Sequence, residues 1–252
     1  MKEDARDGGM QVISRAVAIL RMLGANAGCS LGAIAKATGL PRSTVQRIVD
    51  ALAAENLVEA GAAGVRMGWG MLQIARLAEI DTAARTRAAL EALFAETHET
   101  VDIAVGHGAE VSFLDRIISD YELRVVPIND RPKPMHAMAN GKAILSSLGN
   151  DEIQRVMAGR MPALTANTLQ SMPALIAEIE EIRATGFSYD REEHALGVCA
   201  IAVPIVVHGL PTHAVSVVTP SSRFEERLPL VKQALTACRS AVERELARSL
   251  PA

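Results

Sequence analysis

Hydrophobic residues in the first 55 positions recur with the period of helices. Three apolar stripes are present, each with the i, i+3, i+4 spacing that places side chains on one helix face. Ser30 precedes the second stripe as an expected N-cap, and Gly39 follows it where a left-handed turn can end a helix. Pro41 fits the first turn of the third helix. We therefore predict three short helices. Their apolar positions are Ile13, Ala16, Val17 and Leu20, then Leu31, Ile34 and Ala35, then Val45, Ile48, Val49 and Leu52.

The pattern then changes to two short strands and returns to helices. Residues 57–60 and 65–68 flank a Gly/Ala tip at 61–64, which predicts a small two-stranded wing. Residues 69–78 have helical periodicity, and a longer helix is predicted over 82–99. We expect a winged helix-turn-helix domain over 10–70, a linker helix over 71–81 and a second domain over 82–250.

The second domain mixes strands and helices. β-Branched residues and turn signals predict successive antiparallel strands over 101–105, 111–118 and 123–128, and two more over 197–207 and 213–219. Helical patterns occupy 140–148, 151–158, 171–185 and 225–249, with Gly186 as a stop signal. This arrangement indicates an α+β fold whose C-terminal domain is similar to sensor domains.

The second and third helices have the pattern of a DNA-binding helix-turn-helix. Ala35, Gly39 and Val45 occupy its small, turn and core positions. Burying the third stripe turns polar side chains outward at the start of the third helix, where a recognition helix contacts base edges. Arg can bind guanine and Gln adenine through paired hydrogen bonds, and Ser and Thr suit phosphates. An ordinary three-helix unit with a solvated polar face is the alternative. The predicted DNA-binding residues are Ser30, Arg42, Ser43, Thr44, Gln46, Arg47 and, on the wing, Arg66, which is either a phosphate contact or a surface charge.

Composition narrows the class of protein. The chain has 252 residues, 49% of them hydrophobic, which is enough for more than one core. No apolar run of membrane-spanning length and no signal-peptide pattern is present, so we expect a cytoplasmic protein without membrane partners. The three cysteines lack metal-ligand spacing, so reduced thiols and no metal are expected. With a net charge of −3, DNA binding requires a local basic surface.

Three stretches of the chain resemble the IclR family of transcriptional regulators. The first is GLPRSTVQRIVDAL with the following ENLVE, the second is PMHAMANGKAIL at 134–145, and the third runs from 168 to 206 and contains Asp-Arg-Glu-Glu followed by Gly-Val. The resemblance implies a winged helix-turn-helix joined by a linker helix to a GAF-like effector domain, without cofactors. It also implies a homodimer or homotetramer on double-stranded operator DNA, a small organic or aromatic acid as effector, and control of a catabolic operon.

By the same resemblance, the effector pocket forms from the strand after the Asp-Arg-Glu-Glu turn, its neighbouring strand and the residues before Gly-Lys-Ala. Two positions depart from the family pattern. Ala200 stands where a Cys is common, with Cys199 on the opposite face by strand alternation, and 216–219 replaces Ser-x-Ser-Gly. We therefore expect few donors and a hydroxylated aromatic acid as ligand. The predicted effector-binding residues are Leu123, Val125, Ala139, Asn140, Asp190, Val198, Ala200, Ser216 and Val218.

The sequence disfavours two other classes of protein. An enzyme is disfavoured because Gly141-Lys142-Ala143 lacks the other residues of a phosphate loop, so Lys142 is expected at the surface. Glu192, Glu193 and His194 are adjacent on a turn and do not have metal-ligand spacing. Asp190 either binds an effector or holds that turn. A purely architectural DNA-binding protein would not need so long a C-terminal domain.

Overall fold

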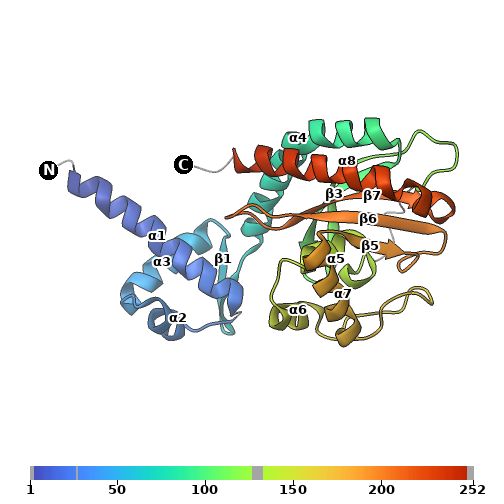
Figure 1. The fold of residues 1–252 in the computed structure, drawn as a ribbon. Coiled ribbons are helices and arrows are strands. Elements are labelled where there is room, and N and C mark those ends of the chain that lie inside the picture. The colour runs from blue at the N-terminus through green and yellow to red at the C-terminus, as the bar shows by residue number, and fades with distance from the viewer. Residues whose placement is uncertain (1–2, 27, 127–132, 249–252) are drawn as a thin grey trace. The chain divides into compact units, whose positions relative to one another are not determined.

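The computed structural model describes residues 3–26, 28–126 and 133–248. The chain divides into two compact units, with the boundary between Glu79 and Ile80. The first unit contains helices and a small hairpin, and the second is built on a five-stranded sheet (Figure 1). The α+β fold class and its antiparallel sheet, expected from the sequence, are confirmed.

Three complete helices, a hairpin and the start of a fourth helix form the N-terminal unit. The complete elements are α1 (Glu3–Ala25), α2 (Leu31–Thr38), α3 (Arg42–Ala54), β1 (Val58–Gly61) and the antiparallel β2 (Gly64–Met67). Ser30 caps α2 by accepting a hydrogen bond from the Ala33 amide, and Gly39 ends it in the left-handed conformation with φ 68°. The second and third predicted stripes meet in one core that includes Ile34, Val45 and Val49. The first stripe was predicted only in part: Ala16 and Leu20 pack against this core, but Ile13 and Val17 are exposed, and α1 buries Ile19 and Leu23 instead.

The helices predicted over 69–78 and 82–99 belong to one element, which ends at Thr97, before the predicted end at 99. The helix α4 runs from Trp69 to Thr97 without interruption. Nothing between the two predicted segments breaks a helix, since residues 79–81 are Glu, Ile and Asp. The gap between the two predicted segments is therefore helical and not a loop.

The C-terminal unit contains an antiparallel sheet in the order β4-β3-β7-β6-β5. The strands are β3 (Thr100–His107), β4 (Glu110–Ile117), β5 (Ser188–Arg191), β6 (Val198–Ile205) and β7 (His213–Pro220). The sequence did not predict β5. The strand predicted over 123–128 is wrong, because residues 123–126 form no strand, and 127–128 lie outside the described residues.

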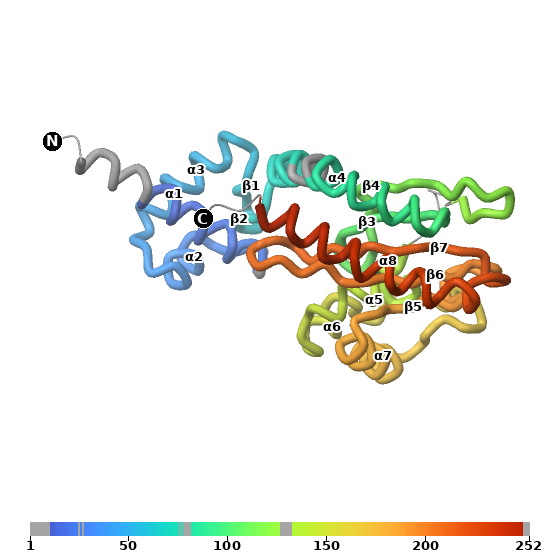
Figure 2. Tube along the Cα trace, turned by 45° about the horizontal axis from the view of Figure 1, so that its top comes forward, coloured from blue at the N-terminus to red at the C-terminus, as the bar shows by residue number. Residues whose placement is uncertain are grey.

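Helices cover both faces of this sheet (Figure 1). The C-terminal part of α4 and α8 (Ser221–Ala247) pack on one face, where Leu90, Leu235 and Val217 share a core. Both views place these two helices side by side (Figure 2). The other face is covered by the 3-10 turn η1 (Met135–Ala137), α5 (Ala139–Leu145), α6 (Asn150–Met157) and α7 (Met172–Thr185). Four alanines on this face let α5 approach the sheet closely. They are Ala104, Ala200, Ala202 and Ala214.

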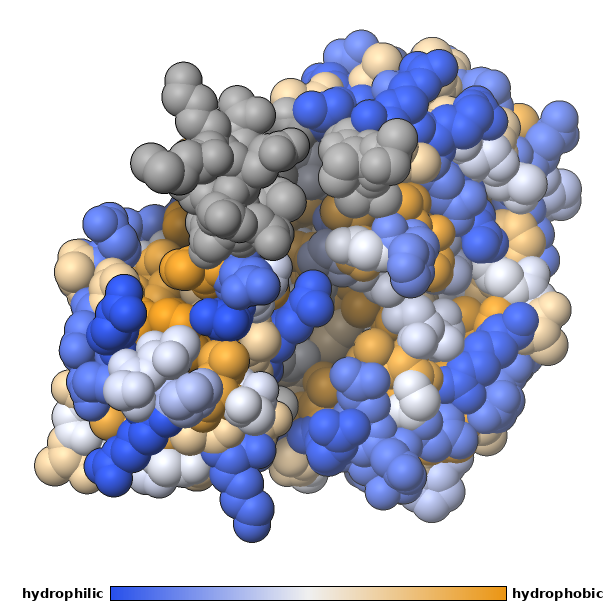
Figure 3. Space-filling view, turned by 90° about the vertical axis from the view of Figure 1, so that its left-hand side faces the viewer, coloured by the Kyte–Doolittle hydropathy of each residue, from blue (hydrophilic) through white to orange (hydrophobic). Residues whose placement is uncertain are grey.

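Hydrophilic side chains are interspersed with hydrophobic ones on the face shown in Figure 3. Among the described residues, no helix is long and apolar enough to cross a membrane.

Candidate functional site

The polar face of α3 is exposed. Val45, Ile48 and Val49 are buried in the N-terminal core, and this orients the other side of the helix toward solvent. Gln46 donates from Nε2 to Asp50 Oδ1 at 2.7 Å, one turn along. Of the predicted DNA-binding residues on this helix, Thr44 is half-buried and the exposed ones are Arg42, Ser43, Gln46 and Arg47.

The two other predicted DNA-binding residues are already engaged within the unit. Ser30 is exposed and its Oγ caps α2. Arg66 on β2 donates from Nε to Glu59 Oε2 at 2.8 Å across the wing, with 63% of its side chain exposed. An exposed ion pair of this kind is weak, so Arg66 remains able to exchange Glu59 for a phosphate.

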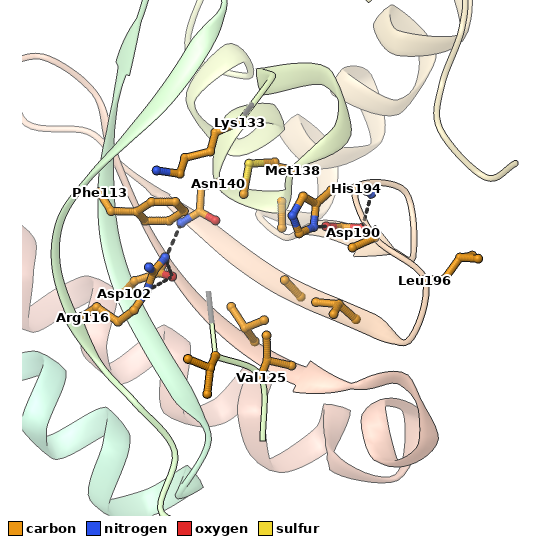
Figure 4. Close-up of a pocket in the computed structure, with 16 residues that line it drawn as sticks. Asp102, Phe113, Arg116, Val125, Lys133, Met138, Asn140, Asp190, His194 and Leu196 are labelled. Carbon is orange, nitrogen blue, oxygen red and sulfur yellow. Dashed lines mark hydrogen bonds and ion pairs between the residues drawn. The ribbon is translucent and has the colours of Figure 1, made fainter. Parts of the chain in front are cut away.

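A pocket of about 180 Å³ lies on the α5-covered face of the sheet in the C-terminal unit (Figure 4). It includes seven of the nine predicted effector-binding residues. Leu123 and Ser216 are not among its lining residues, and Leu123 is 62% exposed. The lining is Asp102, Phe113, Arg116, Val125, Val126, Lys133, Met138, Ala139, Asn140, Asp190, His194, Ala195, Leu196, Val198, Ala200 and Val218.

A bulge brings two pocket residues together that strand alternation would separate. Asp102 pairs with Arg116 and Ala104 with Phe113, so Leu114 is the extra residue in β4. Because cross-strand partners share a face, both Phe113 and Arg116 point to the pocket side. The guanidinium carbon of Arg116 stacks 4.0 Å from the centroid of the Phe113 ring.

Asp102 is the centre of the pocket's polar floor. It is fully buried, and it accepts hydrogen bonds from Arg116 Nη2 at 2.9 Å, Asn140 Nδ2 at 2.9 Å and Ser216 Oγ at 2.6 Å. Four polar groups therefore satisfy one another in a low-dielectric site. Asn140 and Ser216, which the sequence offered as ligand donors, direct these donors to Asp102 instead.

Lys133 adds a positive charge on the same side of the pocket. Its ammonium lies 5.5 Å from the centroid of the Phe113 ring. Among the residues that the structure describes, no carboxylate forms an ion pair with this ammonium. Since Asp102 already compensates Arg116, Lys133 is the cation in this lining that is left to interact with a bound anion.

Asp190 holds the turn at the other end of the pocket. Its Oδ1 accepts from the backbone amides of Glu193 at 2.8 Å and His194 at 3.4 Å, and its Oδ2 lies 3.6 Å from His194 Nδ1. Of the two roles considered from the sequence, the structural one is therefore present. Asp190 also lines the cavity (Figure 4). Its side chain is 3% exposed.

A buried ion cluster supports this turn from behind. Lys142, expected at the surface, is fully buried, and that expectation was wrong. Its Nζ donates to both Glu193 oxygens, at 2.6 and 2.7 Å, and to Glu178. Burial raises the pKa of Glu193 to about 7, although Lys142 acts to lower it. Among the described residues, no group of His, Cys, Asp or Glu forms a metal-binding cluster.

Family models match both units. Residues 12–61 match the IclR helix-turn-helix domain, and residues 74–244 match the C-terminal domain of the bacterial transcriptional regulator IclR. The chain belongs to the IclR family of transcriptional regulators.

Two relatives cover nearly the whole length of this IclR-family chain. The HTH-type transcriptional regulator TtgV of Pseudomonas putida is 40% identical over 246 residues, covering 96% of this chain and 94% of TtgV. A transcriptional regulator of Mycobacterium tuberculosis is 36% identical over 96% of this chain and 95% of its own length. Both relatives are named as HTH-type transcriptional regulators.

Solved structures have the same fold as this IclR-family chain. A transcriptional regulator from Silicibacter has a TM-score of 0.64 and 25% identity, over 95% of this chain and 98% of its own. An IclR homolog from Microbacterium hydrocarbonoxydans, complexed with 4-hydroxybenzoate, has a TM-score of 0.61 and 23% identity, over 94% of this chain and 100% of its own.

Several pocket residues of this IclR-family chain were not predicted. A charged residue inside the apolar run Val101–Val105 was a signal for Asp102, because strand interiors rarely contain an uncompensated carboxylate. No comparable signal marked Phe113 and Arg116, since their common orientation depends on the bulge. The main pocket residues missed are Asp102, Phe113, Arg116, Lys133, Met138 and His194.

Proposed function

We propose that this chain binds operator DNA through the exposed face of α3, as a symmetric oligomer, and changes its affinity for DNA when a small organic acid occupies the pocket. The observation that supports the ligand part is the pocket itself, which combines a mostly apolar lining with one cation, Lys133, that forms no ion pair with a carboxylate of the described residues. A pocket with an apolar body and a few polar groups is typical of small-molecule sites.

The ligand that suits this pocket has an acid at one end and an apolar or aromatic body. Lys133 offers positive charge at one side, next to the Phe113 ring on which the Arg116 guanidinium, already paired with Asp102, is stacked. Met138, Val198 and Val218 offer hydrocarbon between the polar ends, and the Asp190 carboxylate can accept a hydrogen bond from a ligand hydroxyl. A hydroxylated aromatic acid matches all three, and 4-hydroxybenzoate in the Microbacterium homolog supports this class.

Titration of the full chain with 4-hydroxybenzoate, glyoxylate and pyruvate tests the ligand class. We expect 4-hydroxybenzoate to bind more tightly than either small keto acid, because the keto acids cannot fill the apolar lining. Preference for glyoxylate or pyruvate would contradict the proposal.

Lys133→Met should weaken 4-hydroxybenzoate binding by about 10- to 100-fold, since a charge-assisted contact contributes roughly 1.5–3 kcal/mol. The neutral analogue 4-hydroxybenzamide should bind wild type and variant almost equally, and Lys133→Arg should retain much of the preference for the acid. Lys232→Met, which removes a lysine on α8 outside the pocket, is the control. An unchanged ratio of acid to amide affinity in Lys133→Met would show that Lys133 does not interact with the carboxylate.

Arg47→Ala should cost about 1–3 kcal/mol per half-site if Arg47 contacts a base, and should relax selection at that base pair. If Arg47 contacts a phosphate, all sequences should bind more weakly and the slope of log affinity against log salt should fall by about 1. Binding to a duplex selected from a random library measures both.

Sedimentation of the same complex gives the number of chains per duplex, and full operator binding by a monomer would contradict the symmetric oligomer. Arg160→Ala in the C-terminal unit is the control.

A further inference from the structure

The segment after β4 forms one wall of the pocket and is bound to the end of α4. We define this wall segment as residues 119–126. Val125 and Val126 line the pocket. The segment forms no helix or strand, so its position depends on the side chains that hold it.

The first group of contacts comes from the chain that immediately follows α4. Ser119 Oγ donates to the His98 carbonyl oxygen at 2.7 Å, and Asp120 Oδ2 lies 3.0 Å from His98 Nδ1. Thr100 Oγ1 accepts from the Ser119 amide at 3.1 Å and donates to the Val125 carbonyl oxygen at 3.0 Å. One hydroxyl at the start of β3 therefore fixes both ends of the wall segment.

Two arginines of α8 complete the connection. Arg223 forms a two-pronged ion pair with the fully buried Glu99, and its Nη2 also donates to the Leu123 carbonyl oxygen at 2.9 Å. Its guanidinium carbon lies 4.7 Å from the centroid of the Tyr121 ring. The carbonyl groups of Leu123 and Val125 thus have side-chain donors in place of the strand partners that the sequence predicted.

Arg227 joins the wall segment directly to the last residue of α4. Its Nη2 donates to the Thr97 carbonyl oxygen at 3.0 Å and to Tyr121 Oη at 2.7 Å. Thr97 is fully buried and its carbonyl belongs to the last turn of the helix. A displacement of Tyr121 therefore changes the hydrogen bonding of the terminal carbonyl of α4.

The helix α4 connects the two units of the chain. It begins at Trp69 in the N-terminal unit and ends at Thr97 in the C-terminal unit. Any signal carried along the chain from the pocket to the DNA-binding unit passes through this helix.

We propose that the wall segment, held by Arg223 and Arg227, couples occupancy of the pocket to the C-terminal end of α4. This rests on the proposed function of the pocket as a ligand site. A ligand that moves Val125 or Val126 shifts the two carbonyl groups bound by Thr100 and Arg223, and through Tyr121 and Arg227 alters the end of α4. Arg227 and Tyr121 are positioning residues, because neither lines the pocket.

The coupling is measured as the ratio of operator affinity with and without saturating 4-hydroxybenzoate, on a duplex selected by the wild-type chain. We expect a ratio of about 5- to 150-fold in wild type, the usual range for two coupled sites. In Arg227→Met and Tyr121→Phe the ratio should fall toward 1, while the affinity for the acid alone stays close to wild type. Arg239→Met, which removes an α8 arginine paired with Glu243 on the same helix, should keep the wild-type ratio. A wild-type ratio in folded Arg227→Met and Tyr121→Phe would overturn the proposal.

A second measurement tests the coupling without any ligand. Val125→Trp places a large ring in the pocket and displaces the wall segment. We expect amide hydrogen exchange at residues 94–100 to change in this variant, and to return toward wild type when Arg227→Met is added. Unchanged exchange at 94–100 in folded Val125→Trp would also overturn the coupling. If 4-hydroxybenzoate does not bind wild type while Val125→Trp alters the end of α4, the proposed ligand is wrong and the coupling is supported.

Discussion

Lys142→Met should lower the free energy of unfolding of the C-terminal unit by about 3–5 kcal/mol at neutral pH, the usual cost of removing one partner from a buried ion pair. Lys142 is fully buried, and Glu193 lies against it with 9% of its side chain exposed. Removing the ammonium leaves Glu193 and Glu178 next to each other without a counter-charge. Urea unfolding followed by circular dichroism measures the loss.

The loss should depend on pH in a direction set by Glu193. Its folded pKa of about 7 lies above the ordinary value of 4.5, so the folded state binds more protons than the unfolded state between these values. The contribution of Glu193 to the free energy of unfolding therefore falls as pH rises from 4.5 to about 7. Without Lys142 the pKa of Glu193 rises further, because a cation no longer favours its charged form. The variant should thus lose more stability at about pH 8 than at about pH 5.

A second substitution separates this charge effect from lost packing. Adding Glu193→Gln to Lys142→Met removes the uncompensated carboxylate, and should recover much of the lost stability and flatten its dependence on pH. Equal losses at both pH values in Lys142→Met, with no recovery in the double variant, would show that packing alone is responsible.

The sequence predicted those features that depend on local pattern. The stripe Val45, Ile48, Val49 is buried as expected. Strand alternation placed Cys199 and Ala200 on opposite faces, and the structure confirms it: Cys199 belongs to the α8-side core, while Ala200 lines the pocket. Burial raises the pKa of the Cys199 thiol to about 11, so the thiol remains protonated at neutral pH.

The features that the sequence did not predict depend on partners distant in the chain. The carboxylates that allow Lys142 to be buried are 36 and 51 residues away, so a lysine between Gly and Ala looked like a surface residue. The β-branched segment at 123–126 looked like a strand, but Thr100 and Arg223 bind its carbonyl groups instead of a neighbouring strand. One extra residue in β4 reverses which side chains face the pocket, and periodicity contains no sign of it.

Gly141→Ala should destabilise the C-terminal unit by about 3 kcal/mol or more and abolish ligand binding, because overpacking against backbone cannot be relieved by a change of rotamer. A Cβ at Gly141 would lie 2.3 Å from both the Cα and the carbonyl oxygen of Met135. Those atoms belong to η1, which leads directly into Met138, Ala139 and Asn140 of the pocket. The sequence resemblance marked this glycine within Gly-Lys-Ala, and the close approach of two backbone segments is the physical reason for it.

Gly149→Ala is the matched control, because the same change meets open space. No atom lies within 4 Å of a Cβ at Gly149, its φ is −71°, and it precedes α6 outside the pocket. It should cost less than about 1 kcal/mol, the loss expected at a helix N-cap, and should leave 4-hydroxybenzoate binding unchanged. Thermal unfolding and calorimetric titration of the two variants give the comparison. If Gly141→Ala unfolds and binds like Gly149→Ala, then η1 can move away from α5 without disturbing the pocket, and the close contact is not what fixes the pocket's shape.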